Sequence, residues 1–322
     1  MKQVKPLPIS KSTVTKILDR YSALIVTLVI IIIATMVKGT DFLSVQNFMN
    51  ILRNNSVIGI IALGMTFVII SGGIDLSVGS VLVASGAVII MTMNATGSIL
   101  LSILAGLIFG ILVGLINGLI IAKGNVPAFI VTLGAMNIYR SVCQHFMKGG
   151  GFTSTSPTYK DISNGYLFDV IPLPIIYFLV CCIVMHLISK HTRFGRHVYA
   201  VGSNEKAAKL SAVNVDRVKI LTYVTMAVCV VIAAIVETSR MNSINATSSG
   251  HFYELDAIAA AVVGGTSMAG GRGSISGTFF GVLILGIMNN MMVLIGVPPF
   301  LVGAVKGTIV VLAVLLQKRE KD

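Results

Sequence analysis

Uncharged polar side chains, mostly amides and hydroxyls, recur in segments of this chain that are otherwise apolar. Those that could line a solute path are Asn54, Asn55, Thr66, Ser71, Ser77, Asn117, Asn137, Asn289 and Asn290. Amides and hydroxyls donate and accept hydrogen bonds without carrying charge, so this set suits a neutral, hydroxyl-rich solute better than an ion. For any single residue, the sequence favours the alternative that its side chain bonds one membrane helix to another.

Three acidic residues lie at breaks in the apolar pattern. Asp75 follows Gly72-Gly73 and precedes Leu-Ser-Val-Gly, so we expect it to cap the helix that follows. A role for Asp75 as a gate beside the solute path is compatible with that expectation. Glu254 and Asp256 stand where a later apolar segment begins. They either cap that helix or form part of a docking surface on the outer side.

Motifs for catalysis, nucleotide binding and metal binding are missing from the sequence. It has no Gly-Lys-Ser/Thr, no HExxH, and five scattered histidines that form no ligand cluster. The four cysteines fall inside or at the edge of apolar runs without metal-ligand spacing, which is typical of buried, reduced thiols. We therefore expect a chain that is not an enzyme and that binds no metal or cofactor.

Composition points to a lipid bilayer as the solvent. Hydrophobic residues make up 55% of the 322 residues and charged residues only 11%, and there is no Trp. That charged share is about half of what a soluble domain carries. The net charge of +12 does not indicate nucleic-acid binding, because the basic residues flank apolar segments and form no continuous face.

The apolar pattern predicts an all-α polytopic membrane protein with about ten transmembrane helices. The expected segments are 20–37, 55–71, 76–93, 98–122, 127–147, 170–189, 218–238, 255–270, 274–295 and 299–317. They form a single transmembrane domain, 20–317, between tails at 1–19 and 318–322. Most of the 24 Lys and Arg residues then fall on the side that holds both tails and the basic loop 190–219. The positive-inside rule places that side in the cytoplasm.

Two glycine-rich segments indicate close helix packing and an internal repeat. Gly106, Gly110, Gly114 and Gly118 recur every fourth residue, as do Gly273, Gly277 and Gly281. Such stripes let backbones approach closely, mainly within one subunit, with a subunit interface as the alternative. The stretches 106–112 and 277–283 also align without a gap, although the expected topology runs them in opposite directions. That combination indicates an inverted repeat, with chance similarity as the alternative.

The basic loop 190–219 is the one long polar stretch, with seven Lys or Arg residues. Within it, Ser203 to Val213 is expected to form a short helix opened by a capping Ser or Asn. Such a helix is presented either to a partner protein or to anionic lipid.

Three motifs resemble the membrane permease of ribose-type ABC sugar importers. They are the blocks at 73–79, at 117–123 with 127–134, and at 254–267 followed by Gly270-Gly-Arg-Gly273. The resemblance runs from about residue 20 to 317. It implies a permease homodimer in the bacterial plasma membrane, an extracytoplasmic sugar-binding protein, and a cytoplasmic ATPase that holds ATP and Mg²⁺.

The same resemblance identifies part of the basic loop as the coupling helix that such permeases insert into a groove of the ATPase. The matching residues are Gly202, Asn204, Glu205, Ala207, Ala208, Leu210 and Ser211. Ala212-Val213 stand where the family pattern usually has Gly-Ile, which puts the end of the helix in question.

The function expected from residues and resemblance together is import of a monosaccharide, ribose or a similar sugar, by alternating access with ATP hydrolysed on a partner. One alternative is a secondary sugar transporter driven by an ion gradient, which would need a buried relay such as Asp75 with Glu237. Another is a membrane scaffold or receptor that transports nothing. The sequence does not name the sugar.

Overall fold

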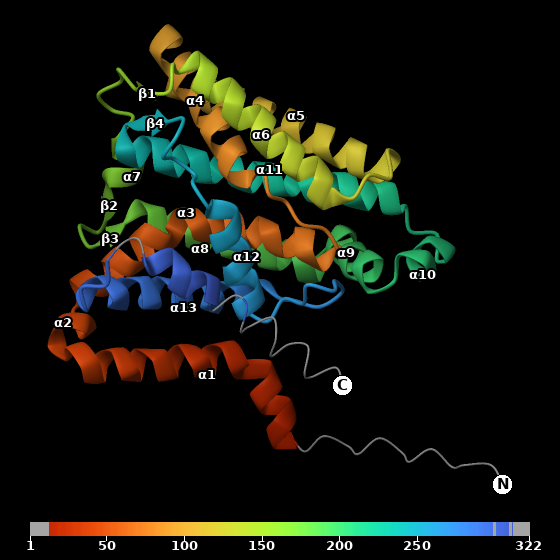
Figure 1. The fold of residues 1–322 in the computed structure, drawn as a ribbon, viewed down its shortest axis with the longest axis horizontal. Coiled ribbons are helices and arrows are strands. Elements are labelled where there is room, and N and C mark those ends of the chain that lie inside the picture. Colours follow the sequence, from red (N-terminus) through yellow and green to blue (C-terminus); the bar gives the residue numbers. More distant parts are fainter. Residues whose placement is uncertain (1–12, 299–300, 309–310, 312–322) are drawn as a thin grey trace.

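A computed structural model describes residues 13–298, 301–308 and 311, and this part of the chain is a bundle of helices with only short strands (Figure 1). The long helices are α1 (Thr13–Lys38), α3 (Val45–Ile70), α4 (Val78–Thr96), α5 (Ile99–Lys123), α6 (Ala128–Phe146), α8 (Leu173–His191), α11 (Val215–Met241) and α13 (Ile275–Leu294). The shorter ones are α2 (Thr40–Leu43), α7 (Asp161–Asn164), α9 (Arg193–Ser203), α10 (Glu205–Leu210) and α12 (Tyr253–Val263), and residues 301–308 are also helical.

The two ends of the bundle differ in structure. At one end, here called the strand end, β1 (Gly151–Thr153) pairs with β4 (Ser243–Asn245), and β2 (Tyr166–Leu167) pairs with β3 (Ile171–Pro172), both antiparallel. At the other end, here called the α10 end, α9 and α10 connect α8 to α11 (Figure 1). The long helices α5 and α13 run between these ends in opposite directions (Figure 1), and the inverted repeat stays a prediction.

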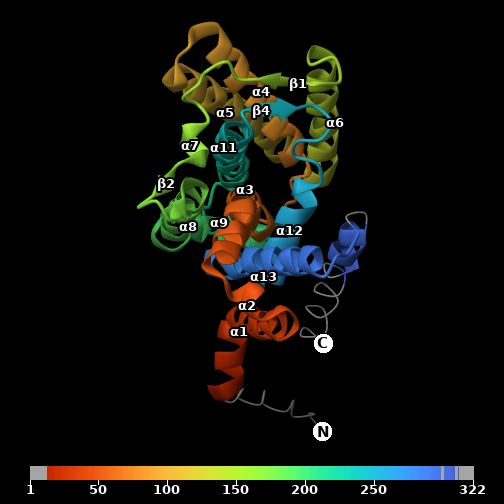
Figure 2. The ribbon, with the colours of Figure 1, turned by 90° about the vertical axis from the view of Figure 1, so that its left-hand side faces the viewer.

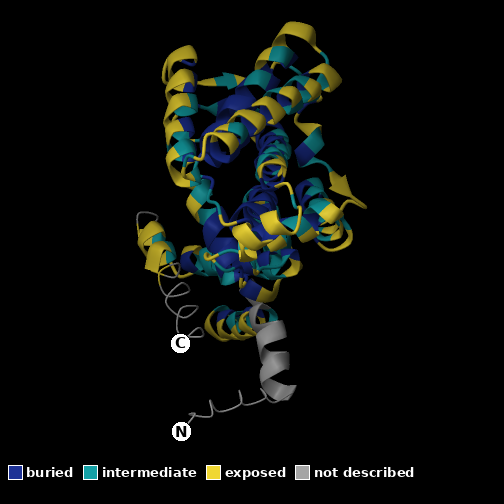
Figure 3. Cartoon of the chain, turned by 90° about the vertical axis from the view of Figure 1, so that its right-hand side faces the viewer, coloured by how far each residue is buried: buried dark blue, intermediate teal, exposed yellow. Residues whose placement is uncertain are grey.

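Helix α11 lies at the centre of the bundle, where it packs against α3, α4 and α5 (Figure 2). Buried residues concentrate in this centre, and exposed residues cover the outer faces (Figure 3). The exposed face of α5 is apolar, with Ile108 60% and Leu112 51% exposed. A wide apolar exterior around a packed interior is what a bilayer solvent demands.

Six of the described helices are long and apolar enough to cross a membrane: α3, α4, α5, α8, α11 and α13. They correspond to the second, third, fourth, sixth, seventh and ninth expected segments. A shorter apolar helix, Leu24–Lys38, lies within the first, and α6 occupies the fifth. The polytopic helical class is confirmed, whereas the count of ten stays a prediction. The tail 318–322, most of the tail 1–19 and parts of the segment 299–317 lie outside the described residues.

Two helices differ in extent from the predicted segments. The second segment was expected at 55–71, but α3 begins at Val45, after Ser44, whose side chain accepts the N–H of Asn47. The eighth was expected at 255–270, but α12 ends at Val263. It stops there because Gly265 adopts a φ of +89°, a conformation that glycine tolerates and that leaves the helix. Residues 264–274 are not helical.

The glycine stripes pack helices within this one chain, as expected. A Cβ added to Gly114 of α5 would lie 2.7 Å from the carbonyl oxygen of Tyr223 in α11. On α13, a Cβ added to Gly277 or Gly281 would meet the backbone of α12 or the residue after it. These backbones therefore approach each other as closely as only glycine permits.

Candidate functional site

The part of the basic loop that carries α9 and α10 is here called the lever segment, residues 192–213. Its two helices are opened by polar side chains: Thr192 accepts the N–H of Gly195 at 3.0 Å, and Asn204 accepts the N–H of Ala207 at 3.0 Å. The expected short helix is thus present with an Asn cap. It is shorter than the expected 203–213, because α10 spans Glu205–Leu210.

The C-terminal end of α10 is well defined despite its alanine. The N–H of Val213 donates to the carbonyl of Ala208 at 3.1 Å, and the N–H of Ala212 donates to that of Lys209 at 3.2 Å. These two bonds make a Schellman motif, whose C′ residue is usually glycine because it is left-handed. Ala212 holds that place with a φ of +59°. The position where the family pattern has Gly is therefore the position that needs positive φ.

The two sides of α10 face different surroundings. Ala208 is only 5% exposed and packs against the rest of the chain, whereas Leu210 is 89% exposed. Ala207, Lys206 and Lys209 are exposed as well. The structure therefore brings the seven residues expected to couple to an ATPase into one turn-and-helix, but it leaves only part of them free for a partner.

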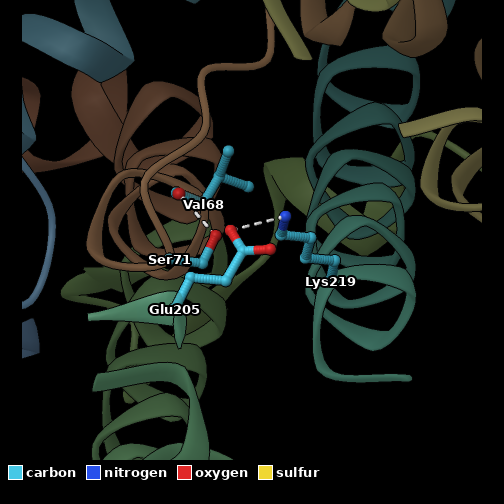
Figure 4. A network of polar contacts seen from close by, with 4 residues as sticks. All are labelled: Val68, Ser71, Glu205 and Lys219. Carbon is cyan, nitrogen blue, oxygen red and sulfur yellow. Dashed lines mark hydrogen bonds and ion pairs between the residues drawn. The ribbon is translucent and has the colours of Figure 1, made fainter. Parts of the chain in front are cut away.

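An ion pair joins α10 to the start of α11. Glu205 and Lys219 lie 2.9 Å apart, and Ser71, at the end of α3, lies beside them (Figure 4). The hydroxyl of Ser71 donates to the carbonyl of Val68 at 2.8 Å. A surface pair of this kind contributes at most about 1 kcal/mol to stability, so it is a minor part of what keeps the lever segment in place.

Backbone packing at Gly202 holds the lever segment against both non-helical breaks of the bundle, residues 71–77 and 264–274. A Cβ added to Gly202 would collide with the carbonyl oxygen of Ile70 and would lie 2.8 Å from the amide nitrogen of Gly271. That same amide donates to the Ile70 carbonyl at 2.9 Å. One glycine of the lever segment therefore lies against Ile70, the residue just before the first break, and Gly271, within the second break.

Side chains of α9 reinforce this joint. The hydroxyl of Tyr199 donates to the carbonyl of Gly273 at 2.9 Å, and burial raises the pKa of Tyr199, so the donor stays protonated. Phe194 stacks on Phe67 of α3 with 5.9 Å between ring centroids.

A cavity of about 430 Å³ opens beside the joint at the α10 end. It lies between the first break, the loop after α5, the lever segment and the start of α11. Its polar lining comes from Ser71, Asn125, Ser203, Asn204, Glu205 and Lys219.

A second group of expected path residues meets deeper in the bundle, where the first break enters α4. One carboxylate oxygen of Asp75 accepts two hydrogen bonds from Ser77, one from its N–H at 2.8 Å and one from its hydroxyl at 2.6 Å. The amide of Asn117 donates to the Ser77 hydroxyl at 3.4 Å. The N-cap residue of α4 is Ser77, so the expectation that Asp75 itself occupies the cap position is wrong. Its carboxylate instead orients the residue that does.

A third group lies towards the strand end, between α3 and α13, and lines a cavity of about 400 Å³. It comprises Asn54, Asn55, Asn289 and Asn290. Asn290 and Asn47 exchange two amide hydrogen bonds, at 2.7 and 3.2 Å, so the side chain of Asn290 ties the two helices together.

The remaining expected residues do not join these groups. The hydroxyl of Thr66 is buried 2.6 Å from that of Thr278 on α13, which is a helix-to-helix contact. Asn137 is exposed on α6 and donates to Leu133 of its own helix. Glu254 and Asp256 lie in the first turn of α12, whose N-cap residue is Phe252. The positive end of the helix dipole stabilises negative charge at this position.

Sequence reasoning missed Lys306, whose ammonium lies 2.9 Å from the carboxylate of Asp256. A lysine within an apolar segment is itself a signal, because a charge there needs a partner, but the sequence does not identify a partner 50 residues away. Tyr199 was missed too, since its acceptor, Gly273, is a distant backbone carbonyl.

Comparison with known proteins assigns the chain to a family. Residues 47–314 match the family model described as the permease component of branched-chain amino acid transport systems. The ribose import permease RbsC of Bacillus subtilis is 41% identical over 295 residues, which cover 91% of each chain. RbsC of Escherichia coli K12 is 39% identical over 313 residues, covering 95% of each. The L-arabinose permease AraH of E. coli is 36% identical, covering 97% of this chain and 94% of AraH.

No solved structure is significantly similar to the chain. The family model nevertheless covers most of the sequence, and the residues it spans include the lever segment and both breaks. The resemblance expected from the sequence motifs is therefore confirmed: the chain belongs to this family of transport permeases, and its homologues are permeases of sugar importers.

Proposed function

We propose that this chain is the permease subunit of an ATP-driven importer that moves a monosaccharide, ribose or a similar sugar, into the cytoplasm. The relatives named above are import permeases for ribose and L-arabinose. Amides and hydroxyls predominate among the polar side chains that line its cavities, beside apolar residues and the charged Glu205 and Lys219, and such groups suit a neutral polyol. The chain is the transport subunit, and ATP and Mg²⁺ bind a partner ATPase.

The observation that carries the proposal is the contact of Gly202 with both breaks. A partner that displaces the lever segment acts at once on the residues before α4, through Ile70, and on those before α13, through Gly271. The first break lines the cavity at the α10 end, and α13 lines the second cavity. Displacement at one surface thereby changes access inside the bundle, as alternating access requires.

The exposed side of α10 is the surface offered to the ATPase. Leu210 and Ala207 present an apolar patch next to Lys206 and Lys209. A protruding Leu beside small residues fits a groove, and the lysines suit acidic or polar groups at its rim. Ala208 takes no part in that contact, because it is buried in its own chain.

The orientation and assembly follow from the same proposal. The α10 end faces the cytoplasm of a bacterial plasma membrane, and the predicted topology puts both tails on that side. The strand end receives an extracytoplasmic sugar-binding protein, two copies of the permease form a homodimer, and nucleic acid is not a partner. The opposite directions of α5 and α13 (Figure 1) support an inverted repeat within a ten-helix topology.

An ion-driven mechanism is disfavoured by the positions of its two carboxylates. Asp75 lies against Tyr223 near the start of α11, whereas Glu237 lies 14 residues further along the same helix and accepts the Tyr253 hydroxyl at 2.9 Å. At 1.5 Å per residue these positions are about 21 Å apart along the axis. The two groups therefore form no continuous relay.

The test is reconstitution of the permease with its cognate ATPase and sugar-binding protein. Sugar uptake into proteoliposomes should require ATP and should persist when ion gradients are collapsed with ionophores. Uptake by the permease alone, or uptake that follows the ion gradient, would overturn the proposal.

A further inference from the structure

The cavity between α3, α13 and the helical residues 301–308 combines free amide groups with apolar walls. It measures about 400 Å³, within the range of roughly 300–1,000 Å³ typical of small-molecule sites. Asn54, Asn55 and Asn289 contribute polar groups, and Ile58 and Val293 contribute apolar surface. Asn55 lies ten residues into α3 from the strand end, which is about 15 Å along the helix.

The amides of this cavity are only partly used by the protein. Asn55 donates to the carbonyl of Ile51 at 2.7 Å, which leaves its amide oxygen available. Within the described part of the chain, the Asn289 side chain makes no hydrogen bond, in contrast to its neighbour Asn290. Asn289 is partly buried and lines the cavity, so its amide is available to donate to and accept from a ligand with hydroxyl groups.

An ion pair adjoins the same cavity. Lys306 reaches both carboxylate oxygens of Asp256, at 2.9 and 3.0 Å, and the side chains are 23% and 15% exposed. A smaller space of about 10 Å³ separates the pair from Asn55 and Asn289, room for about one water molecule or one hydroxyl group. Carboxylate and ammonium groups make stronger hydrogen bonds to hydroxyls than neutral groups do.

We propose that this cavity is a monosaccharide-binding subsite in the half of the permease nearer the strand end. Asn55 and Asn289 bind hydroxyls of the sugar, Ile58 and Val293 pack against its C–H groups, and one hydroxyl inserts next to the Asp256–Lys306 pair. The proposal rests on the proposed function in that the solute is a sugar. It adds the place where that sugar is held, independently of how ATP drives its passage.

The test measures protection of a new thiol in the purified full-length permease, in lipid nanodiscs without ATPase or sugar-binding protein. Val293→Cys places the thiol on the cavity wall, and peptide mass spectrometry separates its maleimide adduct from the native cysteines. Ribose, xylose, arabinose and glucose are titrated to about 100 mM, enough to detect a millimolar Kd. At least one monosaccharide should slow modification about threefold or more in a saturable way, while maltose, a disaccharide, should not.

Variants in the same background assign the residues. Asn289→Ala should weaken protection about tenfold, the loss of one good hydrogen bond. The double variant Asp256→Asn with Lys306→Gln should also weaken protection about tenfold. Changing both residues leaves no unpaired charge that would unfold the chain. Asp161→Asn, at an exposed site, is the matched control and should leave protection unchanged.

Two outcomes would contradict the inference. If no monosaccharide protects the thiol, the cavity is not a sugar subsite. If the double variant is protected as well as the parent, the ion pair is not part of the site. Neither result would touch ATP-dependent uptake in the reconstituted importer, so failure of this inference and failure of the proposed function are distinguishable.

Discussion

Replacing Gly202 with alanine is the sharpest perturbation of the proposed coupling. The added Cβ collides with the Ile70 carbonyl and lies 2.8 Å from the Gly271 amide nitrogen. Neither atom can move without shifting a backbone, so the lever segment must lift from one or both breaks. Overpacking of this kind costs about 1–3 kcal/mol. That free energy corresponds to roughly a 5- to 150-fold decrease in the equilibrium constant for contact between the lever segment and the two breaks.

The assay is ATP-dependent sugar uptake in proteoliposomes, with ATP hydrolysis measured on the same sample. Gly202→Ala should reduce uptake by that factor while the ATPase still co-purifies, because the exposed side of α10 is unchanged. Gly134→Ala is the matched control, since a Cβ there meets no atom within 4 Å, and its uptake should equal that of the unmodified protein. Normal uptake by Gly202→Ala would refute the reasoning that this contact transmits motion.

Three further predictions concern single side chains. Leu210→Asp should weaken ATPase binding about 10- to 100-fold, the loss of one buried leucine, and pull-down against Asp169→Asn as control measures it; full binding would exclude Leu210 from the contact. Ala212→Gly should stabilise the permease by about 1 kcal/mol by relieving the φ of +59°, and a thermal unfolding midpoint that falls would contradict the Schellman assignment. Asp75→Asn should retain ATP-driven uptake, because its oxygen still accepts from Ser77; abolished uptake in a correctly folded variant would contradict this and show that transport needs the negative charge.

The apolar helices were predictable where hydropathy alone determines them. Helix α5 was expected at 98–122 and spans Ile99–Lys123, because its apolar run has sharp ends. The start of α3 was missed because Asn47 and Asn50 lower the local hydropathy. The partner that accommodates Asn47 within the helix is Asn290, 243 residues away, and a pairing so distant in sequence is invisible in a local window.

The candidate site was predictable in composition but not in grouping. The sequence indicated a short capped helix in the basic loop, and Asn204 provides the cap. It could not show that Gly202 touches Ile70 and Gly271, since those contacts are made by the backbone. It likewise pooled ten polar residues into one path, whereas the structure divides most of them among separate groups and leaves Asn137 on an outer face.

The contact among Ile70, Gly202 and Gly271 is built from main-chain atoms, and this has a mechanical consequence. A side-chain contact can absorb a small push by rotating about a χ angle, but peptide groups have no such freedom. A conformational change of the ATPase would therefore be transmitted to α4 and α13 at the same time and with little loss of displacement. Stiffness at this joint, rather than the strength of any single bond, would then set how closely each cycle of ATP hydrolysis is matched to the delivery of one sugar.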